Sequence, residues 1–197
     1  MEKRNKHFGL SIMIGVLIML PSWTTAQTIT GNFTQLTEKE GLSSNTINSI
    51  LVDDLGYIWI GTYNGLVRYD GYEFKRFYSD PNDSDAIRGM VAGNLYEDSR
   101  KNIWLGTNPA YIIRYDPFAR AFRSYDIDSL LTPQLGQAPI NGYYMNDVCE
   151  DDRGRMYFGI SGPEQLQNGL IYIDEGQDQV QLFPNSDTRP LQNVYSI

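Results

Sequence analysis

The side chains that could do chemistry in this sequence are mainly carboxylates, because histidine and cysteine are almost absent. His7 is the single histidine and Cys149 the single cysteine among 197 residues. His7 lies in an N-terminal segment that we expect to be removed. The mature chain would then have no imidazole for a Ser-His-Asp triad, a Cys-His pair, a histidine-ligated metal or a phosphate acceptor. Cys149 has no partner for an internal disulfide, and we interpret it as a small core residue.

Pairs of acidic residues are the remaining candidates for catalysis or metal binding. The pairs are Asp53-Asp54, Glu97-Asp98 and Asp151-Asp152. Paired carboxylates could bind calcium or act as a general acid and base, but the ligand spacing of an EF-hand is absent. Each pair falls at one position of a repeat, in a short turn, where Asp hydrogen-bonds its own backbone. We interpret the pairs as turn chemistry, and we expect no catalytic, metal-binding or cofactor-binding residue in this chain.

The first of these turns lies among four short runs that are typical of β-strands. Residues 47–52, 57–60, 66–69 and 74–78 are rich in Trp, Ile, Val, Phe and Tyr, which suit a pleated and half-buried surface. Asn64-Gly65 joins the middle two runs and predicts a two-residue hairpin turn with positive φ at both residues. Four strands in about thirty residues correspond to one blade of a β-propeller.

The same pattern returns twice and then begins a third time. Residues 94–107 and 147–160 repeat residues 49–62, and residues 193–197 match residues 46–50. We place blades at 42–78, 87–125 and 144–183, and the start of a fourth at 191–197. A period of 40 to 55 residues with four strands indicates a propeller. The sequence therefore predicts an all-β fold of four-stranded antiparallel blades in an incomplete ring, with no helix after the leader.

Aspartates, glycines and aromatic residues recur at fixed positions of this repeat. We interpret the aromatic residues as packing between blades, and the glycines after the second strand as places of close backbone approach. The repeated positions are Asp53, Gly56, Trp59, Gly61, Asp98, Trp104, Gly106, Asp151, Gly154, Tyr157 and Gly159.

Two stretches suggest that the chain is the front part of something longer. Residues 27–41 form a lead-in, of which 33–36 could be a strand that closes a ring. Propellers need about four to eight blades to close. We therefore expect the end at Ile197, in the middle of a strand, to be a truncation.

The segment 1–26 has the features of a secretory signal peptide. Lys3, Arg4 and Lys6 precede an apolar stretch that is too short to span the ~30 Å core of a bilayer. Three of the 16 basic and one of the 24 acidic residues lie in this segment, so its removal leaves 13 against 23 and a net charge of −10. Such a surface disfavours nucleic acids and anionic membranes as partners. We expect an exported, periplasmic domain.

The loops that differ between blades are the candidates for a ligand site, since irregular loops on a regular scaffold often carry function. Residues 108–110 replace the tight turn in the second blade, and an insertion at 161–168 interrupts the third. Tyrosines with neighbouring amides can stack on a sugar ring and hydrogen-bond its hydroxyls. The candidate ligand-binding residues are Tyr63, Asn64, Tyr111, Tyr143, Tyr144 and Asn146.

The first blade resembles the two-component regulator propeller repeat. The likeness rests on residues 41–47 (GLSSNTI), 53–62 (DDLGYIWIGT) and 64–71 (NGLVRYDG), and it weakens in the third blade, where Tyr157 and Ile160 replace Trp and Thr. The resemblance implies the N-terminal part of the periplasmic sensor of a hybrid two-component histidine kinase of Bacteroidetes. It also implies an oligosaccharide ligand, a homodimer, and further parts downstream: more propeller, a β-sandwich stalk, a membrane helix and the kinase.

Two other functions remain open at the level of the sequence. One is a secreted propeller hydrolase or lyase that cleaves polysaccharides with paired carboxylates. The other is a free-standing interaction propeller without a kinase. The fixed place of the acidic pairs in the repeat counts against the enzyme, and the sequence downstream of Ile197 would separate the sensor from the free-standing propeller.

Overall fold

The computed structural model describes residues 33–80, 82–83, 86–108, 111–130, 144–161, 169–174 and 179–182. The chain divides into two compact units, residues 1–35 and 36–197, and all the elements below belong to the second. The expected signal peptide and the start of the fourth blade lie outside the described residues, as does Tyr143. Residues 33–36 form no strand.

Three four-stranded antiparallel sheets confirm the prediction of an all-β fold built from blades. Neighbouring strands within each sheet follow chain order. Blade 1 contains β1 (Ile47–Val52), β2 (Ile58–Thr62), β3 (Gly65–Tyr69) and β4 (Phe74–Phe77). Blade 2 contains β5 (Met90–Glu97), β6 (Ile103–Asn108), β7 (Tyr111–Asp116) and β8 (Ala121–Asp126). Blade 3 contains β9 (Tyr144–Glu150), β10 (Met156–Ser161), β11 (Gly169–Ile173) and β12 (Val180–Leu182).

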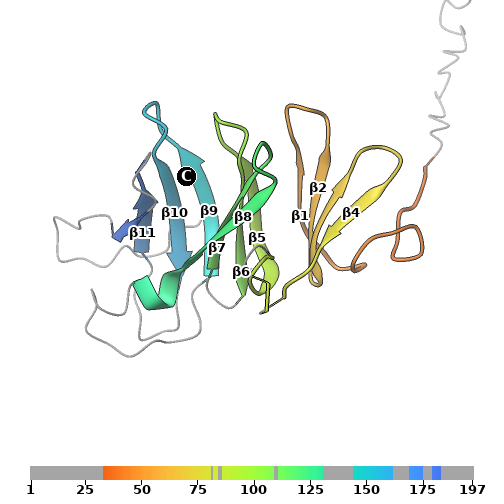
Figure 1. The fold of residues 1–197 in the computed structure, drawn as a ribbon, viewed down its shortest axis with the longest axis horizontal. Helices are drawn as coiled ribbons and strands as arrows, with labels where there is room; N and C mark the ends of the chain where they lie inside the picture. The colour runs from red at the N-terminus through yellow and green to blue at the C-terminus, as the bar shows by residue number, and fades with distance from the viewer. Residues whose placement is uncertain are drawn as a thin grey trace, which may run out of the picture. The chain divides into compact units, whose positions relative to one another are not determined.

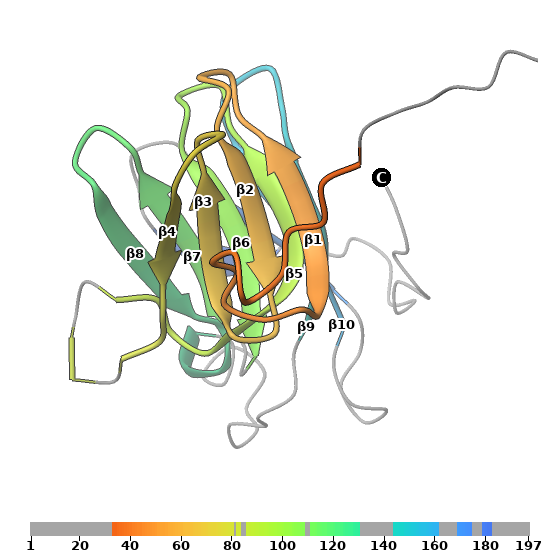
Figure 2. The same cartoon turned by 90° about the vertical axis from the view of Figure 1, so that its right-hand side faces the viewer.

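The blades lie side by side, and their first strands are neighbours. β1 contacts β5, and β5 contacts β9. Figure 2 shows these inner strands gathered on one side, with the outer strands β4 and β8 on the opposite side. In Figure 1 the turns between the first and second strands of each blade lie together at the top, and we call this the turn end. We call the opposite end, where β1, β5 and β9 begin, the entry end. The three described sheets do not close a ring.

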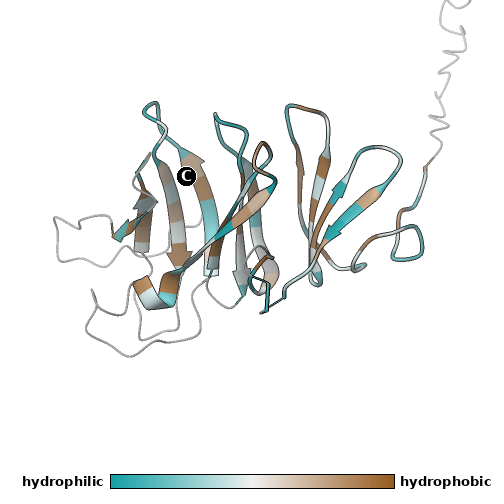
Figure 3. Ribbon diagram, viewed as in Figure 1, coloured by the Kyte–Doolittle hydropathy of each residue, from teal (hydrophilic) through white to brown (hydrophobic). Residues whose placement is uncertain are grey.

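Apolar side chains fill the space between the sheets. We call the contact between blades 1 and 2 the first joint, and the contact between blades 2 and 3 the second joint. Burial of these apolar surfaces is the main force that holds blade to blade. Figure 3 shows brown, apolar positions along the strands of each sheet. The first joint buries Trp59, Leu66, Ile87, Ile103, Leu105, Ile113 and Tyr115. The second joint buries Trp104, Ile112, Met145, Val148, Met156, Phe158, Ile171 and Ile173, among others.

The face of blade 1 that is turned away from blade 2 is only partly covered. Leu42, from the segment before β1, packs there against Ile60 and Val67. Nearer the turn end, Ile50 is 65% exposed and Val52 is 61% exposed. This face therefore offers apolar side chains that the described residues leave in contact with solvent.

The turn between β2 and β3 differs from the prediction. Thr62 pairs with Gly65, so the two loop residues are Tyr63 and Asn64. Only Gly65 adopts a positive φ, of 104°, and Asn64 does not. A Cβ at position 65 would lie 2.4 Å from the carbonyl oxygen of Phe77, so the packing of β4 also requires glycine here. The Asn-Gly pair signalled the hairpin correctly but not its turn type.

Two further expectations need correction. Residues 127–130, after β8, are helical, although no helix was expected after the leader. Cys149 on β9 is only half-buried and pairs with Tyr157, so it is not a core residue. Burial, followed by the nearby carboxylates of Asp147 and Asp151, raises the pKa of its thiol above the ordinary value.

Candidate functional site

A repeated aspartate organises the turn end of each blade. Oδ1 of Asp53 accepts hydrogen bonds from the amides of Leu55 and Tyr57, at 3.0 and 2.8 Å, and Oδ2 accepts from Nε1 of Trp59 at 2.7 Å. The carboxylate thus ties the turn to the ring of the following strand. Because backbone amides and an indole already occupy both oxygens, this group serves the turn and is not available as a general acid or base.

Asp98 and Asp151 make the same connection in the other two blades. Asp98 accepts from the amides of Arg100 and Asn102 through Oδ1, and from Nδ2 of Asn102 and Nε1 of Trp104 through Oδ2. Asp151 accepts from two turn amides at 2.9 Å, and from the Tyr157 hydroxyl at 3.2 Å. The amide of Arg155 is the main cause that lowers the pKa of Asp151. Among the residues that the structure describes, no cluster of three or more His, Cys, Asp or Glu side chains could hold a metal ion.

The pair Glu97-Asp98 is shifted by one residue against the other two acidic pairs, contrary to the expectation that every pair falls at the same position of the repeat. The repeat places Glu97 and Glu150 at the position of Val52, one residue before the shared aspartate. These glutamates link blades. Oε2 of Glu97 accepts from the amide of Asp54 at 2.9 Å, and Oε2 of Glu150 accepts from the amide of Ser99 at 2.7 Å.

Each link therefore runs from the turn of one blade to the inner strand of the next. In the second joint, Oγ of Ser99 also donates to Oε1 of Glu150, at 2.6 Å. In the first joint, Nζ of Lys101 adds an ion pair with the carboxylate of Asp54. Burial is the main cause that raises the pKa of Glu97, and the Asp54 amide opposes it.

A second set of links joins the inner strands further toward the entry end. Oγ of Ser49 donates to the carbonyl oxygen of Gly93 at 3.0 Å. At the equivalent position of blade 2, Nδ2 of Asn94 donates to the carbonyl oxygen of Asn146 at 2.8 Å. The two joints thus share one polar frame, with a link near the middle of the inner strands and another at the turn end.

The recurring tryptophan rings pack between blades, so they offer no surface for a sugar to stack on. Trp59 is 1% exposed and lies 5.2 Å from the ring of Tyr115 in blade 2. Trp104 is 2% exposed and lies 5.4 Å from the ring of Phe158 in blade 3. Tyr157 is only half-buried. The repeated glycine lies within the second strand and not after it as expected, and in blade 2 it permits a close approach, since a Cβ at Gly106 would lie 2.7 Å from Cβ of Met145.

The candidate ligand-binding residues that the structure describes lie toward the entry end. Tyr63 is 59% exposed at the β2–β3 turn, and Tyr144 is 47% exposed at the start of β9. Asn64 is exposed, and its Nδ2 donates to the carbonyl oxygen of Ser43 at 3.3 Å. Tyr111, at the start of β7, packs against the first joint instead.

Asn146 lies two residues after Tyr144, and its Oδ1 accepts from Oγ of Ser161 at 3.2 Å. Met90, at the start of β5, is 42% exposed at this end and was missed from the sequence. A methionine in a strand pattern is normally interpreted as a core residue, so only the three-dimensional fold shows that Met90 is exposed. The entry end therefore combines exposed apolar side chains with amide and hydroxyl groups.

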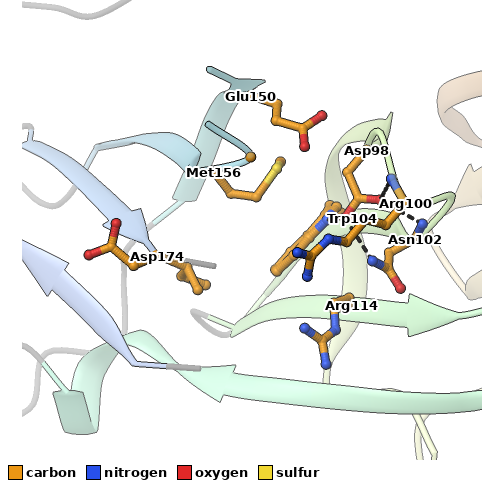
Figure 4. Close-up of a pocket in the computed structure, with 10 residues that line it drawn as sticks. Asp98, Arg100, Asn102, Trp104, Arg114, Glu150, Met156 and Asp174 are labelled. Carbon is orange, nitrogen blue, oxygen red and sulfur yellow. Dashed lines mark hydrogen bonds between the residues drawn. The ribbon is translucent and has the colours of Figure 1, made fainter. Parts of the chain in front are cut away.

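A hollow between blades 2 and 3 was also missed from the sequence. It lies in the second joint near the turn end, with Trp104 and Met156 facing each other across it and Arg114 below (Figure 4). Its cavity volume is about 30 Å³. Cζ of Arg114 lies 5.7 Å from the centre of the Trp104 ring. The residues that line the hollow are Asp98, Arg100, Asn102, Trp104, Arg114, Glu150, Gly154, Met156, Ile173 and Asp174.

The comparisons with known proteins agree with this architecture. The sequence profile of the two-component regulator propeller matches residues 41–64. A segment of 55 residues is 38% identical to histidine kinase P4 of Formosa agariphila, and this match covers 28% of the chain and 4% of that protein.

Solved structures extend the likeness to most of the chain. The extracellular domain of the hybrid two-component system BT4673 from B. thetaiotaomicron is 25% identical, with a TM-score of 0.53 over 78% of this chain and 18% of that one. The extracellular domain of the hybrid system BT3049 from the same organism shares the fold, with a TM-score of 0.57 and 21% identity over 76% of this chain and 20% of that one. The chain thus spans about a fifth of the solved domains that it matches.

The sheets, the links between them and the repeated turn define three blades of a β-propeller. The first of them contains the match to the two-component regulator propeller, the repeat that the sequence resembles. The chain is similar in fold to extracellular domains of hybrid two-component systems. No helix in the described part of the chain is long and apolar enough to cross a bilayer.

Proposed function

We propose that these blades belong to the periplasmic sensor of a hybrid two-component histidine kinase, where they help to recognise oligosaccharides. The observation that carries the proposal is the match of the first blade to the regulator propeller repeat, together with the likeness of the blades to an extracellular domain of such a system. In this proposal the blades bind and do not catalyse, since the repeated aspartates serve the turns.

The entry end is the proposed recognition surface. Tyr63 and Tyr144 present exposed rings there, and Asn64 and Asn146 present amides. Rings can stack on the apolar face of a pyranose while amides hydrogen-bond its hydroxyls. Ligand binding would favour one geometry of a sensor homodimer and so bias a kinase beyond the membrane, provided that the ligand binds the two geometries with different affinity.

Calorimetric titration of the purified chain with a panel of defined oligosaccharides tests the binding half of the proposal. We expect Tyr144→Ala and Tyr63→Ala to weaken binding at least tenfold, because stacking contacts carry much of such affinities. Tyr72→Ala and Phe118→Ala are matched controls, since these rings are 92% and 82% exposed but lie at the turn end. Equal losses in both pairs of variants would contradict the placement of the site.

The proposed role in signalling is tested by sequencing the gene beyond this chain. The proposal expects the reading frame to continue past the codon for Ile197 into further propeller repeats, a membrane helix and a kinase with a phosphoacceptor histidine. A stop codon directly after Ile197 would refute the kinase part and leave the interaction propeller in its place.

A further inference from the structure

Blades 1 and 3 stand at the two ends of the row of sheets, so each has one face without a neighbouring blade among the described residues (Figure 1). We call the face that a blade turns toward its predecessor in the chain the trailing face, and the face toward its successor the leading face. The two joints each bring a leading face against a trailing face. The trailing face of blade 1 and the leading face of blade 3 are the two end faces.

The trailing face of blade 1 is built like the faces that lie inside the joints. Leu42, Ile60 and Val67 form a buried cluster on it. Their counterparts in blade 2 are buried in the first joint: Ile87, Leu105 and Ile113. The same aliphatic cluster that meets a preceding blade in the first joint is therefore present on blade 1.

The leading face of blade 3 also keeps the outline of a joint. Tyr157 stands at the position of the buried tryptophans and pairs with Cys149 on β9. Asp147 lies two residues before Cys149, on the same face of the strand. Two copies of the chain, joined head to tail through their end faces, would supply twice the three described sheets, and six blades fall within the range of about four to eight in which propellers close. A second copy is thus the obvious occupant of both end faces.

The link between inner strands would fail in such a pairing. In the two joints Ser49 and Asn94 donate to a carbonyl oxygen of the next blade, at 3.0 and 2.8 Å. Asp147 stands at this place in blade 3, and its Oδ1 accepts from the amide of Val148 at 2.9 Å. An ionised carboxylate has no proton to donate. Against a second copy it would face the carbonyl oxygen of Asn48, so two acceptors would oppose each other.

The link at the turn end would fail as well. In the two joints a turn amide donates to Glu97 or Glu150 on the inner strand of the next blade, at 2.9 and 2.7 Å. Against a second copy the amide of Asp152 would meet Val52, which stands at the glutamate position and has no acceptor. Both links that hold the two observed joints are therefore missing from the pairing of blade 3 with blade 1.

We propose that Val52 and Asp147 are specificity-determining residues of the end faces. Together they prevent blade 3 of one copy from docking on blade 1 of another, so two chains do not close into a six-bladed ring. The apolar cluster on blade 1 favours association, and the polar frame decides which blade can associate. The proposal concerns the faces of the sheets and not the entry end, so it holds or fails independently of the proposed sugar surface.

Restoring the two links tests the proposal. Val52→Glu together with Asp147→Asn supplies the missing acceptor and the missing donor, and it leaves the net charge unchanged. Sedimentation velocity of the full chain over a range of concentrations measures association. We expect this double variant to dimerise with a dissociation constant at least about a hundredfold below that of the wild type, because a closed dimer gains two links in each of its two joints. Each single variant should gain less.

Two further variants show whether the links, and not charge alone, cause association. Ile50→Glu with Asp147→Asn places the same charge on the same face but two residues away, and it should not match the double variant. Asp152→Pro, added to the double variant, removes the turn amide and should weaken the dimer about tenfold. Position 152 is the second residue of a turn that the amide of Gly154 closes on the carbonyl oxygen of Asp151, at 2.9 Å, where proline is favoured.

Circular dichroism shows whether each variant folds. If Val52→Glu disrupts blade 1, Val52→Gln offers the same acceptor without a charge and replaces it. The proposal is overturned if the wild type dimerises as tightly as the double variant, or if the folded double variant stays monomeric. It is also overturned if the Ile50→Glu control dimerises equally well, or if Asp152→Pro leaves the dimer unchanged.

Discussion

In the first joint the rings of Trp59, Phe77 and Tyr115 lie 5.2 to 6.0 Å from one another and fill the space between the sheets. In the second joint Ile173 stands where Tyr115 would be, and a hollow opens beside Trp104. The polar links are nevertheless the same, from turn amide to glutamate and from inner-strand side chain to carbonyl oxygen. The comparison shows that the polar frame sets how one blade meets the next, while the apolar filling varies.

Loss of a repeated aspartate should reduce the free energy of unfolding more than any other substitution considered below. Asp98→Ala leaves the indole N–H of buried Trp104 and the amide of Asn102 without acceptors, which should cost about 3 kcal/mol of unfolding free energy. Urea unfolding followed by circular dichroism measures this cost. Asp151→Ala should cost less, because its ring partner Tyr157 is half-exposed and bonded at 3.2 Å. Equal costs at the two positions would contradict the role given to the buried indole.

A methyl group at Gly106 should push blades 2 and 3 apart at the second joint and leave the first joint unchanged. Its Cβ would lie 2.7 Å from Cβ of Met145, so we expect Gly106→Ala to lower the unfolding free energy by about 1–3 kcal/mol. Gly169→Ala is the control, because the nearest atom there is 3.7 Å away. If both substitutions have the same effect, the close approach of β9 to β6 is not what requires glycine.

Lys101 tests the ion pair with Asp54 in the first joint. It adopts φ of 72° where blades 1 and 3 have Gly56 and Gly154, at 86° and 77°. Lys101→Ala keeps this backbone strain and loses the pair with Asp54, whereas Lys101→Gly loses the pair but relieves the strain. The glycine variant should therefore be more stable than the alanine variant by about 1 kcal/mol in thermal or urea unfolding. An alanine variant as stable as the glycine variant would contradict the strain at this turn.

The smallest expected effect is the pH dependence that Glu97 brings to the first joint. Burial raises its pKa, so the folded chain binds this proton more tightly than the unfolded chain. Its contribution is fully present below the unfolded pKa, near 4.5, and is lost as the pH rises through the higher folded pKa. Glu97→Gln removes this loss and should gain stability relative to the wild type as the pH increases across that window. Parallel stability curves of the two proteins from pH 4 to pH 7 would disprove the linkage.

The repeat made much of the fold predictable. The recurring Asp and Trp positions indicated blades, and the aspartates were correctly interpreted as turn residues from their place in the pattern. Glu97 was misread as a member of an acidic pair, because neighbours in sequence were grouped before the repeats were aligned residue by residue, and Glu150 was not singled out at all. Their partners lie in another blade, and such contacts leave no signal within one repeat.

The hollow and the conformation of the β2–β3 turn could not be predicted from the sequence, because they too depend on contacts between segments that are distant in the repeat. Asn102 stands at the repeat position of Tyr57 and Ile173 at that of Tyr115, and only the three-dimensional structure shows that both residues line the hollow. The dipeptide Asn64-Gly65 predicted positive φ at both residues, whereas only Gly65 has it, and a Cβ at position 65 would lie 2.4 Å from the carbonyl oxygen of Phe77 on the next strand. Pairing across blades or strands, more than local propensity, decides these features.

The direction of the glutamate links has a consequence for how such arrays can grow. Every link has its donor on the turn of one blade and its acceptor on the inner strand of the blade that follows in the chain. A duplicated copy of blade 2 therefore brings one donor and one acceptor, and it fits between existing blades without any change in its neighbours. Val52 lacks the acceptor, so blade 1 cannot be copied into an interior position in the same way. Gene duplication should accordingly lengthen this kind of chain from within.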